Sequence, residues 1–310
     1  MAFTAFRGMK PFPQLLFTTF VILVCFLVFM LLSMAVAIPL FGVEALFQMS
    51  SLTQLSDPET IRMLKFFQVI QSIGLFIIPP LVLAWLFHGK IAGYLFLNRP
   101  VTTVAAMLVV VLVFVVNPAI NFTGSLNADM NFPEWLSGVE KWMRQSEDAA
   151  ARLTDAFLKT ETTTGLLFNL FMIAVLPALG EELLFRGVVQ QILTRWTRNA
   201  HAGIWLAAAL FSALHMQFFG FLPRLLLGVL FGYLLLWSGS LWLPILAHFV
   251  NNGAAVLGTW YIDQGKLDRS FEEIGAAPGN TWMAMVSILL TALVLWAIRR
   301  QYREQRLSPQ

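Results

Sequence analysis

Side chains that could perform chemistry together occur in three apolar segments in the second half of the sequence. They are Glu181, Glu182, Arg186, His215, His248 and Asn252. Charged and imidazole groups are costly inside a membrane, where they usually face the interior of a helix bundle and mark function. We therefore predict that these residues form one shared site.

The spacing of the first group divides its roles. Glu182 and Arg186 are four residues apart, which places them on one face of a helix, where they can form an ion pair. Glu181 lies about 100° around the helix from Glu182 and can point at a different helix. The pair is therefore expected to hold its own helix in place, and Glu181 is suited to accepting a proton near neutral pH.

His248 and Asn252 are also four residues apart, so both can donate a hydrogen bond to one oxygen atom. His215, on a separate segment, could complete the site. Two chemistries fit this set: a divalent metal site, and a metal-free hydrolase with a glutamate base and a His/Asn oxyanion hole. A zinc peptidase usually carries two histidines on one helix, whereas here each histidine has its own segment, which disfavours zinc.

The composition predicts that these segments cross a membrane. Apolar residues make up 58% of the 310-residue chain and charged residues 12%. Globular domains usually have about 45–50% apolar residues and about 25% charged residues. A soluble fold could not cover its surface with so few charges, and a nucleic-acid-binding protein would show a basic face. The single cysteine, Cys25, lies in an apolar run and excludes an intrachain disulfide and a cysteine-based zinc site.

We therefore predict an all-α, polytopic integral membrane helical bundle that forms a single domain over residues 1–310. About 20 apolar residues are needed to span the hydrocarbon core. Eight segments qualify: 14–40, 66–87, 101–117, 165–193, 204–216, 225–236, 242–259 and 281–298.

The charges predict how the bundle is oriented. With both termini in the cytoplasm, the inside segments hold ten Lys and Arg residues and one acidic residue. The longer outside loops then hold nine Lys and Arg residues and fourteen acidic residues. The density of Lys and Arg is then about twice as high inside, as the positive-inside rule requires. The longest loop, 118–164, is expected outside, with an amphipathic helix that either lies in the interface or caps the bundle. Counting along the segment 165–193 places Glu181 nearer the cytoplasmic side.

The three motifs, taken in order, resemble the CPBP family of intramembrane proteases, which includes the CaaX prenyl endopeptidases (Rce1-like) and bacterial Abi-type proteins. The family pattern is EExxxR, FxxxH and HxxxN on successive membrane helices. This sequence has Glu181-Glu182-xxx-Arg186, Phe211-xxx-His215 and His248-xxx-Asn252. The resemblance covers about 165–258, which we expect to be the catalytic core.

The resemblance implies a glutamate-dependent peptidase without a metal or other cofactor. Glu181 would activate water with help from His215, while His248 and Asn252 would hold the oxyanion and Glu182 and Arg186 would organise the site. The expected partners are membrane lipids and a protein or peptide substrate, lipid-modified or not, and no nucleic acid. The short loops favour a multi-pass protein of a bacterial plasma membrane.

Three other functions remain open from the sequence. They are a non-catalytic immunity or scaffolding protein on the same fold, a metal-dependent membrane hydrolase, and a transporter or proton relay, since membrane-embedded Glu and His also serve in proton transfer.

Overall fold

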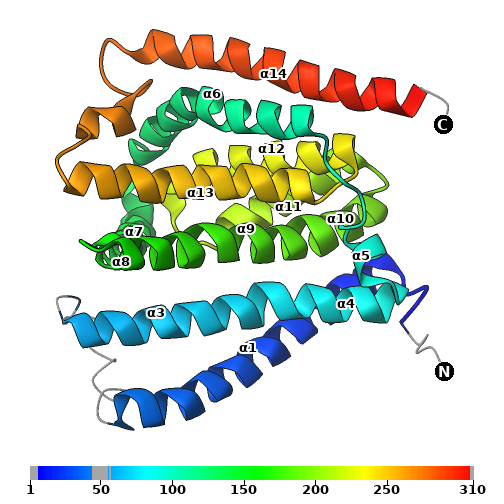
Figure 1. Ribbon diagram of the computed structural model, residues 1–310, viewed down its shortest axis with the longest axis horizontal. Coiled ribbons are helices and arrows are strands. Elements are labelled where there is room, and N and C mark those ends of the chain that lie inside the picture. Colours follow the sequence, from blue (N-terminus) through cyan, green and yellow to red (C-terminus); the bar gives the residue numbers. More distant parts are fainter. Residues whose placement is uncertain (1–5, 44–54, 56, 308–310) are drawn as a thin grey trace.

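The computed structural model describes residues 6–43, 55 and 57–307, and all regular secondary structure in this part of the chain is helical. The long helices run side by side between two ends of one bundle (Figure 1). The predicted polytopic helical bundle is therefore confirmed. The principal helices are α1 (Pro11–Phe41), α3 (Pro58–Ser72), α4 (Ile78–His88), α5 (Ile91–Tyr94), α6 (Thr103–Ala128), α7 (Ser137–Leu158), α11 (Ala200–Ala213), α12 (Phe221–Ser238), α13 (Trp242–Asp263) and α14 (Thr281–Leu307).

One further long helix runs continuously over Thr163–Thr197, and it carries the first motif. It consists of α8 (Thr163–Asn169), the π-helical η4 (Leu170–Val175), α9 (Leu176–Glu181), the π-helical η5 (Glu182–Val189) and α10 (Gln190–Thr197). A third π-helical stretch, η2 (Ile73–Ile77), joins α3 to α4. Single π turns inside α-helices are frequent at functional sites, and here two of them lie immediately before and after α9.

Six helices are long and apolar enough to cross a membrane: Pro11–Phe41, Pro58–His88, Thr103–Ala128, Thr163–Thr197, Phe218–Ser238 and Thr281–Glu304. A seventh apolar helix, Ala200–Leu214, is shorter, and α13 occupies the remaining predicted segment. Each of the eight predicted segments thus corresponds to a helix, while the number of membrane crossings stays a prediction.

The largest difference from the predicted boundaries is at α6, which continues past Pro118 to Ala128, so residues 118–128 belong to a helix rather than to the predicted loop. A proline usually ends a helix because it disrupts the hydrogen-bond ladder. Ser287 of α14 repairs the ladder beside Pro118: its hydroxyl accepts from the Ala119 amide at 3.2 Å and donates to the Val115 carbonyl at 2.6 Å. Ser287 is 168 residues from Ala119 in the sequence, so a local sequence pattern could not predict that the helix continues past Pro118.

The two ends of the bundle differ in charge. One end holds the start of α1, the end of α4, α5, the end of α10 and the end of α14 (Figure 1), and we call it the basic end because the ten inside Lys and Arg residues of the sequence prediction belong to these segments. The other end holds α7 and the start of α8, and we call it the α7 end. Both described ends of the chain lie at the basic end, as an even number of crossings requires.

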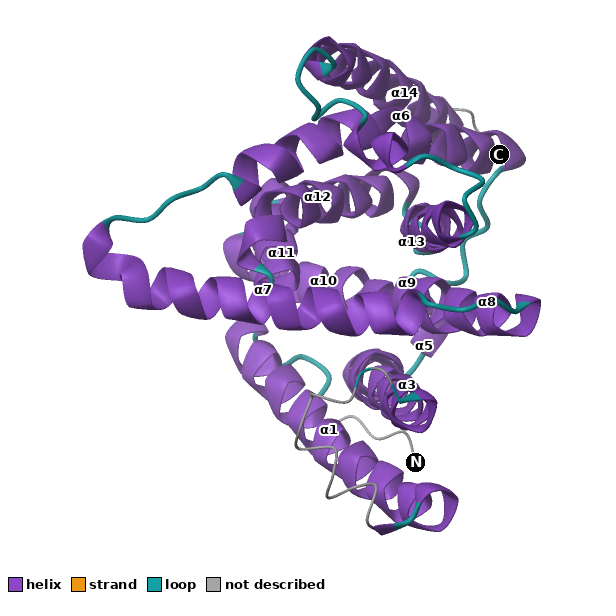
Figure 2. Cartoon of the chain, turned by 90° about the vertical axis from the view of Figure 1, so that its left-hand side faces the viewer, coloured by secondary structure: helices purple, strands orange, loops and turns teal. Residues whose placement is uncertain are grey.

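Helix α7 lies across the bundle at the α7 end, and its Ser137 end projects beyond the other helices (Figure 2). Its buried residues are Met143 and Phe157, whereas Trp142, Val139 and the preceding Trp135 are exposed, Trp135 at 80%. Packing on the bundle and exposed aromatic residues thus occur in the same helix. The helix therefore combines features of the two predicted arrangements, a bundle cap and an interfacial helix.

The orientation can be tested by cysteine labelling in intact cells after Cys25 has been replaced. We expect Arg303→Cys, at the basic end, to be protected from a membrane-impermeant maleimide, because Lys and Arg concentrate on the cytoplasmic side. Lys141→Cys in α7 should be labelled. Both positions are exposed, so cell lysis should make them equally reactive, and labelling of the first before lysis would contradict the prediction.

Candidate active site

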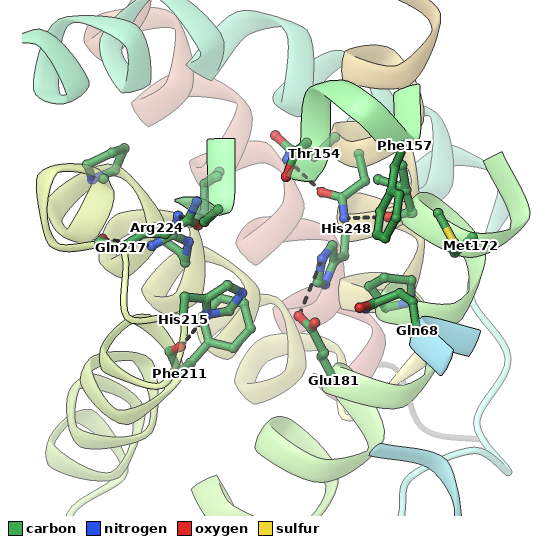
Figure 3. A pocket seen from close by; sticks show the side chains of 18 of the residues that line it. Gln68, Thr154, Phe157, Met172, Glu181, Phe211, His215, Gln217, Arg224 and His248 are labelled. Carbon is green, nitrogen blue, oxygen red and sulfur yellow. Dashed lines mark hydrogen bonds and ion pairs between the residues drawn. The ribbon is translucent and has the colours of Figure 1, made fainter. Parts of the chain in front are cut away.

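A cavity of about 610 Å³ extends from the middle of the bundle toward the α7 end. Its walls come from α3, α7, η4, α9, α11, the α11–α12 connection, α12 and α13, and they include Glu181, His215, His248 and Asn252 (Figure 3). The four predicted catalytic residues are thus brought to one cavity from α9, α13 and the turn that follows α11. The remaining two, Glu182 and Arg186, are buried behind it.

Glu182 and Arg186 form the predicted ion pair, with 2.9 Å between Arg186 Nη1 and Glu182 Oε1, and both are buried. The same carboxylate oxygen lies 2.8 Å from His248 Nδ1. Glu182 therefore joins the first motif to the third and fixes the orientation of the His248 ring. Its other oxygen, Oε2, is buried and has no hydrogen-bond partner among the described residues.

Arg186 is held on several sides. Its guanidinium group lies 4.7 Å from the ring centre of Phe211 and 5.5 Å from that of Phe231, distances at which a cation is attracted to an aromatic face. Its Nη2 donates to the carbonyl of Gly228 at 3.1 Å. A side chain at residue 228 would begin 3.3 Å from Nη2 and 3.0 Å from the Ala208 side chain, so glycine allows this close packing.

Glu181 points into the cavity instead of into the ion-pair network, as the helical spacing predicted (Figure 3). Its Oε2 atom lies 3.8 Å from His248 Nε2, which is too long for a direct hydrogen bond. The two carboxylates thus contact opposite nitrogens of one imidazole. The carboxylate of Glu181 is the one that a water molecule or a substrate in the cavity can reach.

His215 lies on another wall of the cavity, at the end of α11. Its Nδ1 lies 2.7 Å from the carbonyl of Phe211, one turn earlier. Because a carbonyl can only accept, Nδ1 carries the proton, and Nε2 of the neutral ring is then a proton acceptor. The Phe211 ring packs edge-on against it with 4.8 Å between ring centres. Phe211 of the FxxxH motif therefore orients His215 with both its backbone and its ring.

Asn252 makes a contact that the motif did not predict. Its Nδ2 donates to the carbonyl of Ile173 at 3.0 Å. Ile173 lies in the π-helical η4, and the residue four positions later, Pro177, has no N–H that could donate to this carbonyl. Asn252 replaces the missing donor, and its Oδ1 accepts from Asn251 at 3.1 Å. One N–H of Asn252 therefore positions the helix of Glu181, and the second remains for a ligand in the cavity.

The site lies near the middle of the bundle and opens toward one of its ends. Glu181 lies near the middle of the 35-residue helix Thr163–Thr197, and the cavity occupies the half of the bundle nearer α7. The opposite half is closed by a core that includes the fully buried Leu83, Leu95 and Ile192. The side of the membrane to which Glu181 is nearer stays a prediction, because it depends on the orientation of the bundle.

The structure also places residues in the cavity wall that the sequence analysis did not single out, including Gln68, Gln217 and Arg224. Arg224 directly precedes the predicted segment 225–236 and was counted among the external basic residues. The sequence offered one indication that Arg224 belongs to the site: it lies between the second and third motifs. The distance between Arg224 and the catalytic candidates depends on the turn after α11, which apolar patterning does not specify.

Comparison with known proteins agrees with the motifs. Residues 163–254 match the family model described as type II CAAX prenyl endopeptidase Rce1-like. An uncharacterized protein of Bacillus subtilis, YpbD, is 33% identical over 86 residues, which cover 26% of this chain and 41% of that protein. No solved structure matches. The matched region contains all six predicted site residues, so the part of the chain that resembles the Rce1-like endopeptidases is the part that forms the cavity.

Proposed function

We propose that this protein is an intramembrane endopeptidase, CaaX-protease-like, that hydrolyses peptide bonds of membrane-associated proteins or peptides. The observation that carries the proposal is that the two adjacent glutamates have different surroundings. Glu182 is neutralised and buried against Arg186 and His248, whereas Glu181 faces a cavity that also holds His215 and Asn252. The Rce1-like match over the same residues supports a peptidase.

In the proposed mechanism Glu181 accepts a proton from a water molecule in the cavity, and the water oxygen attacks the carbonyl carbon of the scissile bond. The carbonyl oxygen becomes an oxyanion, which the free N–H of Asn252 and a protonated Nε2 of His248 stabilise. The tetrahedral intermediate then breaks its C–N bond, and Glu181 returns the proton to the leaving amine. His215 Nε2, as an acceptor, orients the water.

His248 can supply Nε2–H when both of its ring nitrogens carry protons. Nδ1 then donates to Glu182, and Nε2 faces Glu181 and the cavity. Glu182 and Arg186 serve as positioning residues, since they act through His248 and through the helix that carries Glu181.

The proposal predicts peptide cleavage by the purified protein in liposomes. We expect wild-type protein to cut a subset of an internally quenched peptide library, with apolar sequences favoured because they partition into the membrane. Glu181→Gln protein at the same concentration is the control for contaminating peptidases. An equal rate in both samples would contradict the assignment, and absence of all cleavage would favour the immunity or scaffolding alternative.

Another prediction concerns metal ions. Among the residues that the structure describes, no three His, Cys, Asp or Glu side chains are grouped so that they could hold one ion. The His248 nitrogens face two different carboxylates, and Nδ1 of His215 is taken by a carbonyl. We therefore expect cleavage to survive prolonged dialysis against EDTA and 1,10-phenanthroline. Loss of activity on dialysis that stoichiometric zinc restores would show a metal-dependent hydrolase instead.

A further inference from the structure

Arg224 places a positive charge at the cavity that holds Glu181. Its side chain is half-buried and lies on the other side of the cavity from Glu181 and His248 (Figure 3). Its Nη1 donates to the carbonyl of Gln217 at 3.2 Å, and its Nη2 donates to Gln217 Oε1 at 2.7 Å. These bonds fix the plane of the guanidinium group through neutral partners and use two of its five N–H groups.

The charge of Arg224 is not neutralised as that of Arg186 is. Arg186 has Glu182 at 2.9 Å, whereas no carboxylate of the described residues lies within 4.0 Å of Arg224. Glu147 of α7 offsets this charge in part: its Oε2 accepts from the Phe219 amide at 3.1 Å, and its Oε1 lies 3.7 Å from the point at which a side chain at residue 220 would begin, on the same side as Arg224 Nη2. A cation in an apolar bundle is costly without a counter-charge, and such residues usually mark a substrate pathway.

The surroundings leave room for a ligand at this group. Residue 220 is a glycine, and a side chain there would begin 3.3 Å from Arg224 Nη2. The cavity is continuous from Arg224 to Glu181 and is large enough at about 610 Å³ to hold several atoms between them. A carboxylate matches the planar fork of a guanidinium group and can accept two parallel hydrogen bonds from it.

We propose that Arg224 is a specificity-determining residue that binds a carboxylate of the peptide substrate while the scissile bond lies at Glu181. The inference rests on the proposed peptidase function. Two parts of a peptide carry a carboxylate, the free C-terminus and an Asp or Glu side chain. Binding of either one would set the position of the cut relative to that group.

The test uses matched peptides with the apolar core that wild-type protein cleaves. One pair differs in a C-terminal carboxylate or amide, and a second pair, amidated at the C-terminus, differs in one internal Glu or Gln that is moved along the sequence. We expect the wild-type kcat/KM to favour one acid over its amide about 30-fold, as the loss of one partner from a desolvated charged hydrogen bond predicts. The pair that shows the preference identifies the source of the carboxylate.

Arg224→Gln should abolish this preference, mainly by raising KM for the acid peptide to the value for the amide. Arg224→Lys should retain part of it, because the charge remains but the fork is lost. Arg144→Gln is the matched control, since Arg144 is a charged residue at the α7 end that pairs with Glu140 outside the cavity. It should keep the wild-type preference, and melting temperatures of all variants show whether they fold.

An acid preference that is the same in wild type and in well-folded Arg224→Gln would overturn the inference, as would a wild-type enzyme without any preference. If Arg224→Gln does not fold, Arg224→Lys decides, because an unchanged preference there contradicts recognition by the fork. Absence of all Glu181-dependent cleavage would instead contradict the proposed function. Binding of both peptide pairs to wild-type protein would then be measured, and equal affinity for acid and amide would contradict the subsite independently.

Discussion

Glu181→Gln is expected to abolish turnover and to leave the fold almost unchanged. Glutamine keeps the shape of the side chain but cannot accept a proton from water. The structural cost is small because the 3.8 Å separation from His248 Nε2 is not a hydrogen bond, and because the side chain faces a cavity. A positioned general base contributes about 10²–10⁴-fold to a rate, and the loss is larger if Glu181 alone activates the water.

The comparison that decides the assignment is activity per folded molecule of Glu181→Gln and Glu182→Gln. Both changes remove one charge from adjacent residues of the same helix, so each is the control for the other. Glu181→Gln should lose turnover and keep its stability. Glu182→Gln should lose both turnover and stability. A well-folded, inactive Glu182→Gln beside an active Glu181→Gln would reverse the two roles. Activity in both would show that the base lies elsewhere.

The site could be predicted as far as helical spacing reaches. Four-residue spacing predicted the Glu182–Arg186 pair, and the turn of about 100° per residue predicted that Glu181 would point elsewhere; the structure shows both. Contacts between helices were beyond this reasoning. The bond from His248 to Glu182 spans 66 residues, and that from Arg186 to Gly228 spans 42. Asn252 of α13 donates to the Ile173 carbonyl in a different helix, where Pro177 lacks the N–H that could do so.

The fold shows the same limit. Apolar runs located the eight long apolar helices, because burial in lipid requires such runs, but they did not locate α5 or the polar ends of the long helices. The helix predicted at 66–87 begins at Pro58, where Asp57 caps it by accepting from the Thr60 amide at 2.9 Å. A capping aspartate followed by proline is a local signal that hydropathy does not count. Ser287, which stabilises α6 at Pro118, is a tertiary contact and leaves no local signal.

The second large effect is expected from breaking the buried ion pair. Glu182 Oε1 accepts from Arg186 Nη1 and contacts His248 Nδ1, and the Glu182 and Arg186 side chains are no more than 2% exposed. Removing one partner of such a pair leaves a buried charge without compensation, which costs on the order of 3–5 kcal/mol. Glu182→Gln and Arg186→Gln should therefore each lower the free energy of unfolding by about that amount, measured by denaturant titration in mixed micelles.

The double variant Glu182→Gln/Arg186→Gln separates this explanation from a general packing defect. Because no lone charge is left, its loss of unfolding free energy should be smaller than the sum of the losses in the two single variants. The difference, the coupling energy, should be about 0.5–3 kcal/mol. Part of the loss should persist, because Arg186 also packs on Phe211 and Phe231 and donates to Gly228. The exposed pair Arg300–Glu304, treated in the same way, is the control and should show little coupling because both side chains are solvated. Additive losses at Glu182 and Arg186 would mean that the pair does not hold the helix of Glu181 in place, and the positioning role would pass to the contacts of Asn252 and Gly228.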